Sequence, residues 1–180
     1  VAAMTKIIPP ESWYSFDKTV RSSLKIDWAV FSSGNGVSFC VLRLKDLQID
    51  PQLFFSKIKI ACVGQSTSSA LLRHGISADL IPNHFQSEGL IDSFSQYNLK
   101  NKRCWLIQAE SPRKTLSIDL ENKGAKIIST PVYRTAPSGK DNSFLLNDLD
   151  QANLDWTIFA SPSAVENFHK FLPVGYWDNL

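Results

Sequence analysis

Residues 27–44 read DWAVFSSGNGVSFCVLRL, and residues 155–172 read DWTIFASPSAVENFHKFL. Aligned without a gap, the two stretches share Asp, Trp, Phe, Ser, Val and a final Leu at equivalent positions. Each has an apolar run of strand type, a serine where that run ends, and an amphipathic helical pattern after the serine. This shared order indicates an internal repeat of one β–α unit.

Around the first copy, short apolar runs alternate with helical patterns. We predict strands at 27–32, 58–63, 79–82, 104–108 and 126–129, and helices near 35–45, 67–74, 88–96 and 113–123. The strands are nearly continuous apolar runs, which is typical of a parallel sheet covered on both faces. Gly75 and Gly124 follow two of the helices, where a left-handed residue commonly ends a helix. Together these elements predict one complete doubly wound α/β lobe over residues 14–128.

The segments outside that lobe predict a second, outer lobe. Residues 1–13 are interpreted as a linker and the end of the outer lobe, and residues 129–142 as the return linker. Residues 143–180 hold the second copy of the repeat, so we interpret them as part of the outer lobe. One strand and one helix do not complete a sheet, and we therefore expect the chain to be a fragment with its outer lobe incomplete.

Composition excludes several classes of protein. A 180-residue chain with 43% apolar and 20% charged residues is typical of a globular protein. The net charge of +2 gives no strong field toward nucleic acid or an acidic membrane. The short basic cluster of Lys100, Lys102 and Arg103 is interpreted as a solvated loop. No stretch reaches the roughly 18 apolar residues that a membrane-spanning helix needs.

The cysteines and histidines do not suggest a metal site. The three cysteines lie far apart in apolar runs, which indicates buried thiols in a reducing compartment. The three histidines have no metal-ligand spacing with the cysteines or with one another. These residues are Cys40, Cys62, Cys104, His74, His84 and His169.

Four turns follow predicted strands at the carboxyl edge of a sheet, where open parallel sheets bind ligands. They lie at residues 32–35, 64–67, 108–113 and 161–163. Three of them lead into a helix N-terminus, whose free N–H groups and dipole favour carboxylate or phosphate. Because Ser33, Thr67 and Ser161 also occupy ordinary helix N-cap positions, capping and ligand binding both stay open.

Familiar catalytic signatures are absent from the sequence. Residues 33–36 (SGNG) lack the third glycine of a dinucleotide fingerprint, and neither a Walker A nor a G-x-S-x-G motif occurs. Asp27 and Asp155 begin strands at the other end of the sheet, so we interpret them as structural. Tyr133, in the sequence PVYRT, could offer a phenolic proton, although a tyrosine in an apolar strand is more often a packing residue.

Several pieces of the sequence carry a more specific pattern. They are DWAVFSSGNGV, VGQSTSSALLRHGISADLIPNHFQSEGLI, PRKTLSIDLENKGAKI leading into PVYRT, and DWTIFASPSAVENF. In this order they resemble the uroporphyrinogen-III synthase family, from about residue 8 to residue 172. The family's opening strand and its closing Gly-x-x-Thr turn are missing, and the turn at 109–112 departs from the family's glycine- and arginine-rich run.

The resemblance implies a fold and an activity. The implied fold is α/β, with two flavodoxin-like (doubly wound parallel sheet) lobes joined by an extended two-strand linker, one lobe inserted in the other. Residues 5–10 and 129–136 would be the linker strands. The implied reaction is cofactor-free cyclisation of hydroxymethylbilane, a linear tetrapyrrole polycarboxylate, to uroporphyrinogen III, with loss of water and inversion of ring D. This reaction belongs to tetrapyrrole biosynthesis.

The resemblance also implies roles for particular residues. Tyr133 matches the family tyrosine that assists departure of the hydroxyl as a proton donor, and Thr67 matches the cleft threonine of V-G-x-x-T. Ser33 and Ser161 match the serines that end the repeated strands. Their neighbours Ser32, Gly34 and Ser163 complete the expected substrate-binding set.

The implied setting is a monomer without nucleic-acid or membrane partners, which takes hydroxymethylbilane in a transient hand-off from hydroxymethylbilane synthase. Its expected location is the cytoplasm, or the plastid stroma if a transit peptide has been removed. Two other hypotheses stay open. One is a non-catalytic two-lobed ligand-binding module or a truncated inactive homologue, and the other is one half of a fusion with a tetrapyrrole methyltransferase.

Overall fold

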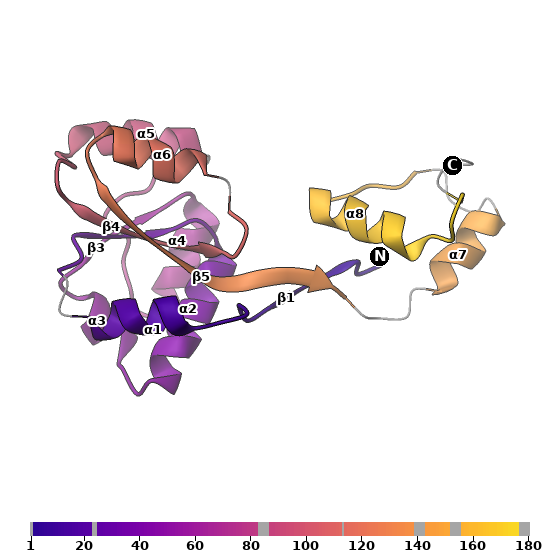
Figure 1. Ribbon diagram of the computed structural model, residues 1–180, viewed down its shortest axis with the longest axis horizontal. Helices are drawn as coiled ribbons and strands as arrows, with labels where there is room; N and C mark the ends of the chain where they lie inside the picture. Colours follow the sequence, from indigo (N-terminus) through magenta and orange to yellow (C-terminus); the bar gives the residue numbers. More distant parts are fainter. Residues whose placement is uncertain are drawn as a thin grey trace. The chain divides into compact units, whose positions relative to one another are not determined.

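The computed structural model describes residues 2–22, 25–82, 87–112, 114–138, 143–151 and 156–176 (Figure 1). Its elements in chain order are β1 (Thr5–Ile8), α1 (Tyr14–Arg21), β2 (Trp28–Phe31), α2 (Gly34–Asp46), α3 (Pro51–Phe55), β3 (Lys59–Cys62), α4 (Gln65–Leu72), α5 (Ser87–Ser93), η1 (Phe94–Gln96), β4 (Arg103–Ala109), α6 (Thr115–Asn122), β5 (Lys126–Pro137), α7 (Ser143–Asp150) and α8 (Pro162–Phe171).

The described strands form one sheet in the order β1-β5-β4-β2-β3. Its parallel part is centred on β2, where Trp28 pairs with Lys59 of β3 on one side and with Cys104 of β4 on the other. β4 pairs in parallel with β5. The fold is therefore mixed α/β, and four of the five predicted strands are confirmed as β2, β3, β4 and β5.

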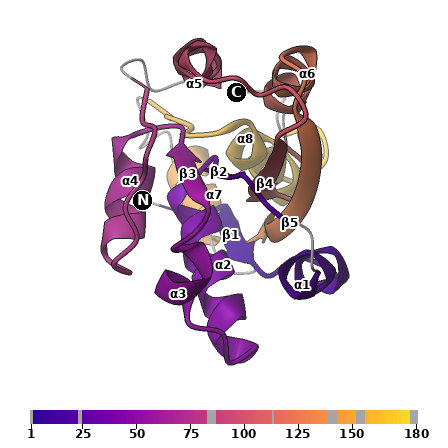
Figure 2. The ribbon, with the colours of Figure 1, turned by 90° about the vertical axis from the view of Figure 1, so that its left-hand side faces the viewer.

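Side chains alternate between the two faces of the sheet because successive residues of a strand point in opposite directions. Ala29 and Phe31 join one apolar cluster with residues of α1, α2, α3 and α4, whereas Trp28 and Val30 join another with residues of α5, η1 and α6. Figure 2 shows α5 and α6 on one side of the strands and α1, α2 and α3 on the other. Burial on both faces explains why the strands read as continuous apolar runs.

The four helices predicted for the inner lobe are confirmed as α2, α4, α5 with η1, and α6, and the helix predicted in the second repeat copy is confirmed as α8. Among the described helices, α1, α3 and α7 escaped prediction. α3 begins with a clear local signal, because Asp50 accepts a hydrogen bond from the Leu53 N–H and Pro51 occupies the first turn. α1 is held by tertiary contacts. Its Asp17 pairs with Arg43 of α2 through two hydrogen bonds of 2.9 and 2.5 Å.

The predicted strand at 79–82 is wrong. Only Leu80 pairs, through an isolated parallel bridge to Ala61 at the outer edge of β3. Asp79 turns its carboxylate onto the Ile60 N–H at 2.7 Å, and Pro82 has no N–H to continue a ladder. The pairing order from this bridge inward is Leu80, β3, β2, β4 and β5. A flavodoxin-like order would instead place the third segment beside the first strand.

The predicted strand in the second copy of the repeat is also wrong for its described residues. Residues 156–159 have no strand structure, and Asp155 lies outside the described residues. A strand requires a hydrogen-bonded neighbour, and no described strand pairs with this segment. Trp156 is consequently 86% exposed, whereas its counterpart Trp28 is 3% exposed between two strands.

The chain divides into two compact units. The inner unit comprises Pro9–Arg134, and the outer unit comprises Val1–Ile8 with Thr135–Leu180. The first copy of the repeat lies in the inner unit and the second copy in the outer unit. Among the described helices, none is both long enough and apolar enough to cross a membrane.

Candidate active site

Three turns of the inner unit meet at the carboxyl edge of its sheet. Phe31 at the end of β2 is level with Cys62 of β3 and with Ile107 of β4. The chain leaves these strands through the turns that begin at Ser32, Val63 and Glu110. Residues that were predicted from separate parts of the sequence therefore share one edge.

At this edge the hydroxyl oxygens of Ser33 and Tyr133 lie 2.9 Å apart, and either group could be the donor. Ser33 is the N-cap of α2, and its Oγ accepts a hydrogen bond from the Gly36 N–H at 3.1 Å. A Cβ atom at Gly36 would lie only 3.3 Å from the Ile107 carbonyl oxygen, so glycine allows α2 to begin close against β4. The hydrogen bond between Ser33 and Tyr133 therefore holds the Tyr133 phenol beside the N-terminus of α2.

A β-bulge aims Tyr133 at Ser33. Gln108 pairs with Pro131 but the next residue, Ala109, pairs with Tyr133, so Val132 is an extra residue in β5. Neighbours on a regular strand face opposite sides, yet the bulge allows both Val132 and Tyr133 to pack against the cluster that contains α2. The Tyr133 ring stacks on Phe39 of α2, with ring centroids 6.2 Å apart.

Two side-chain hydrogen bonds support the register of β5 before the bulge. The buried Trp105 indole donates from Nε1 to Oγ1 of Thr130 at 2.8 Å. Gln108, also buried, donates from Nε2 to Oγ of Ser129 at 2.8 Å. Because both bonds join β4 to β5, they fix the part of β5 that leads directly into Tyr133.

Three charged residues, Glu11, Glu110 and Arg134, form a cluster beside the backbone of Tyr133. The sequence did not predict this cluster. The Glu110 N–H donates to the Tyr133 carbonyl at 2.8 Å, and the Glu110 carboxylate accepts from the Glu11 N–H at 3.2 Å. Arg134 lies 4.0 Å from both Glu110 and Glu11. Its Nε is buried and has no hydrogen-bond partner among the described residues. Glu110 stands out in the sequence only as a departure from the family's usual turn, and no local pattern pairs it with Glu11.

The other predicted residues of the inner unit lie in the same turns. Ser32 is half-buried. A Cβ atom at Gly34 would meet Ala70 of α4 at 3.7 Å, so α2 begins against α4. Thr67 lies in the first turn of α4, but its side chain is only 3% exposed and offers little surface to a ligand in this conformation.

The outer unit repeats the serine cap. Ser161 has φ −160° and ψ 155°, almost the values of Ser33 (φ −160°, ψ 158°), and its Oγ accepts from the Ala164 N–H at 3.2 Å. Its Oγ also lies 3.1 Å from the Ser163 Oγ. Ser161 lines a cavity of about 560 Å³ within the outer unit, together with Trp156 and Phe168. The Ser33 cap belongs to the inner unit and the Ser161 cap belongs to the outer unit.

The buried thiols show no sign of nucleophile chemistry. Burial raises the pKa of the Cys104 thiol to about 12, and it also moves the pKa of Cys40 and Cys62 upward. A thiol with a raised pKa is a poor nucleophile at neutral pH. Across the part of the chain that the structure describes, His, Cys, Asp and Glu side chains form no group of three that could hold a metal ion.

Comparison with known proteins gives a consistent result. The chain matches the family described as "Uroporphyrinogen-III synthase HemD" over residues 1–179. The uroporphyrinogen-III synthase of Synechococcus elongatus is 30% identical to it over 170 residues, which are 93% of this chain and 62% of that protein. The Chlorobaculum parvum uroporphyrinogen-III synthase is 23% identical over 166 residues, covering 92% of this chain and 65% of that protein.

Solved structures share the fold. A mutant uroporphyrinogen III synthase of Thermus thermophilus superimposes with a TM-score of 0.68 at 18% identity, covering 93% of this chain and 65% of the other. The uroporphyrinogen-III synthetase of Helicobacter pylori gives a TM-score of 0.58 at 17% identity, covering 94% of this chain and 70% of the other. At these identities the likeness concerns the fold alone. The chain spans less than two thirds of the length of the two sequence relatives.

Proposed function

The chain belongs to the uroporphyrinogen-III synthase family, and we propose that the whole protein cyclises hydroxymethylbilane to uroporphyrinogen III with loss of water. The observation that carries this proposal is the Ser33–Tyr133 hydroxyl pair, 2.9 Å apart at the N-terminus of α2. A phenolic hydroxyl at the sheet edge where parallel α/β proteins bind ligands supports a role for Tyr133 as a proton donor.

In the proposed reaction Tyr133 donates its phenolic proton to the terminal hydroxyl of the substrate. The C–O bond breaks, water leaves, and the remaining electrophile is an azafulvenium cation beside the phenolate. The ring D carbon that carries the bridge to ring C bonds to this cation and gives a spiro intermediate. The bond from that carbon to the bridging methylene then breaks, and the methylene bonds to the free α-carbon of ring D, which inverts the ring and closes the macrocycle. The proton that the ring carbon loses on closure returns to the phenolate, so the net change is loss of one water molecule.

The substrate is reactive by itself, so the protein has mainly to hold one conformation and exclude others. This requirement suits a site of hydroxyl groups and backbone N–H groups. The N-terminus of α2 offers such groups beside Ser33, and its dipole favours the carboxylates of a polycarboxylate substrate. We propose that Ser32, Gly34 and Thr67 complete this half of the site, with Thr67 becoming accessible when the ligand binds.

The second half of the proposed site is the serine cap of α8, with Ser161 and Ser163. Its backbone geometry matches that of Ser33 closely, which supports an equivalent role in binding a carboxylate. We propose a two-lobed protein with doubly wound lobes. In it the inner unit is inserted in the outer lobe and both serine caps hold one tetrapyrrole.

We further propose that the protein acts as a monomer in the cytoplasm. Because hydroxymethylbilane also cyclises spontaneously, to the isomer without ring inversion, a transient hand-off from hydroxymethylbilane synthase would shorten its time in solution. The monomeric state, the cytoplasmic location and the hand-off are proposals that go beyond the family assignment.

The experiment that tests the function supplies fresh hydroxymethylbilane, made in situ, to the full-length protein and separates the isomers formed. A synthase raises the ratio of uroporphyrinogen III to uroporphyrinogen I above that of the spontaneous reaction. A non-catalytic binding module or an inactive homologue would leave isomer I as the main product, and this result would refute the proposal.

A further inference from the structure

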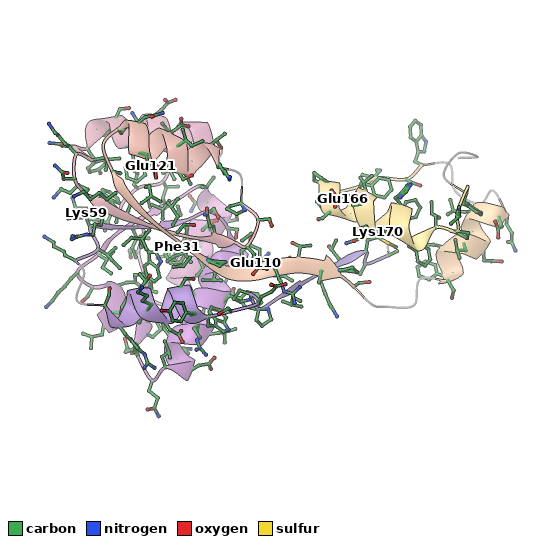
Figure 3. All side chains as sticks on the ribbon, viewed as in Figure 1. Phe31, Lys59, Glu110, Glu121, Glu166 and Lys170 are labelled. Atoms are coloured by element: carbon green, nitrogen blue, oxygen red, sulfur yellow. The ribbon has the colours of Figure 1, made fainter. Side chains whose placement is uncertain are left out.

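The inner unit carries a basic pocket at the other end of its sheet. The strands are parallel, and Trp28, Lys59 and Cys104 form one rung at their amino ends, whereas Ser33 follows their carboxyl ends. Figure 3 shows Lys59 and Glu110 toward opposite ends of this sheet, with Phe31 between them. The pocket is therefore separate from the candidate active site.

Four lysines and one carboxylate are the charged groups that line this pocket of about 390 Å³: Lys25, Lys57, Lys59, Lys102 and Asp27. Asp27 is already engaged, since it accepts hydrogen bonds from the Arg103 N–H at 3.0 Å and from Lys102 at 3.4 Å. Lys25, Lys57 and Lys59 form no ion pair within the described ranges of the chain. The pocket consequently has an excess of positive charge.

Two aromatic rings help to place one of these charges. The Lys59 ammonium lies 5.5 Å from the centroid of the Trp28 ring and 5.4 Å from that of Tyr97. Trp28 is nearly fully buried and packs edge-to-face against Tyr97 and Phe94, with centroids 4.9 and 5.0 Å apart. Because these rings are packed, the cation–π contacts hold the ammonium at the pocket and restrict its motion.

The lysines also converge on the neighbouring surface. Lys57 lines two adjoining hollows of about 670 and 290 Å³, of which the first also involves Lys59 and the second Lys25. Helix C-termini attract lysines, and Lys57 follows the end of α3. The other three lysines lie outside the last turn of any described helix, so this effect does not explain the cluster. Like charges gathered in a cleft repel one another and concentrate counter-ions.

We propose that this pocket is a second ligand site, for a small anion that carries at least two phosphate or carboxylate groups. Its volume lies within the roughly 300–1,000 Å³ range of small-molecule sites. Lys25, Lys57 and Lys59 bind the anionic groups, and the half-buried Tyr97 ring forms an apolar wall. The site is independent of the proposed reaction, because its residues lie at the opposite end of the strands.

The test uses two probes, pyrophosphate and citrate, titrated into the full chain at low salt by calorimetry. We expect saturable binding of at least one probe, and the tighter of the two identifies phosphate or carboxylate as the preferred group. The variant Lys57→Gln/Lys59→Gln should raise the dissociation constant at least tenfold. A control with the same charge change elsewhere, Lys114→Gln/Lys170→Gln, should change it less than twofold.

Two results would overturn the proposal. One is the absence of saturable binding of both probes at millimolar concentration, and the other is an equal loss of affinity in the two double variants. A single substitution in a loop, Lys25→Gln, guards against a folding artefact and should weaken binding at least threefold. Failure of these tests would leave the cyclisation proposal untouched, since they do not measure turnover.

Discussion

Tyr133 and Ser33 are 100 positions apart in the sequence and 2.9 Å apart in the structure. Their contact depends on a hydrogen-bond cap at one residue and on a bulge at the other. Replacing a single hydroxyl therefore separates the chemical role of the pair from its packing role.

Tyr133→Phe should lower the turnover of the full-length protein by about 10²-fold, the low end of general acid catalysis. The ring can still stack on Phe39, so we expect an unchanged melting temperature. The measurement is the initial rate of uroporphyrinogen III formation. Tyr14→Phe, at an exposed tyrosine, is the matched control and should keep the wild-type rate. Wild-type turnover in Tyr133→Phe would remove the phenol from the mechanism.

The three buried cysteines allow a second prediction at this scale. Since burial keeps them protonated and covered, a thiol reagent at neutral pH should label none of them in the folded protein. All three should react after unfolding in denaturant. Counting labelled thiols by mass spectrometry decides the matter, and rapid labelling of Cys40 in the folded protein would contradict its complete burial.

At the scale of elements, the pairing of β4 with β5 positions the active-site strand. The Trp105 Nε1–H donates to Thr130 inside the core, and both residues are buried. Thr130→Val would leave this N–H without its partner. We expect the free energy of unfolding to fall by about 1–3 kcal/mol. Thr135→Val, at an exposed position of the same strand, should change it by less than about 0.5 kcal/mol, and equal losses in a denaturant titration would refute the role of the buried bond.

The Asp27 carboxylate links the start of β2 to the start of β4 through its hydrogen bond from the Arg103 N–H. The free energy of unfolding should therefore depend on pH. Burial pushes the pKa of its carboxyl upward. Hydrogen bonds from Arg103 and Lys102, with the charges of Lys102 and Lys25, outweigh this and hold the pKa below the ordinary value of 3.8. The stabilisation is therefore present above about pH 4 and is lost as pH falls through the lowered pKa. Asp27→Asn should cost stability at pH 7 and progressively less as the pH falls below about 4, and a cost that does not change with pH would contradict the assignment.

Elements differ in how far the sequence predicts them. Runs buried on both faces, such as those of β2 and β4, are recognisable because four consecutive positions of each strand are apolar. Residues 156–159 have the same pattern but no strand, since strand formation depends on partners that a local pattern does not reveal. The position of the turn Ser32–Gly34 at the sheet edge could be predicted because the turn follows an apolar run directly. Arg134 and Glu110 were not, because their contacts depend on the register and the bulge of β5.

At the scale of the whole molecule, the proposed binding of the ligand depends on the two serine caps. The caps at Ser33 and Ser161 agree within a few degrees in φ and ψ, yet they belong to different compact units. We propose that one tetrapyrrole is held by both caps, and this proposal would account for the repeated cap.

The central claim that both caps hold one ligand can be tested directly by a distance measurement. Spin labels would be attached at Asn35→Cys in α2 and Glu166→Cys in α8, two exposed positions, while the native cysteines stay buried. Pulsed electron spin resonance would record the distance distribution with and without saturating uroporphyrinogen III under anaerobic conditions. We predict that the ligand narrows the distribution and moves it to shorter distances. An unchanged distribution with ligand demonstrably bound would contradict the claim.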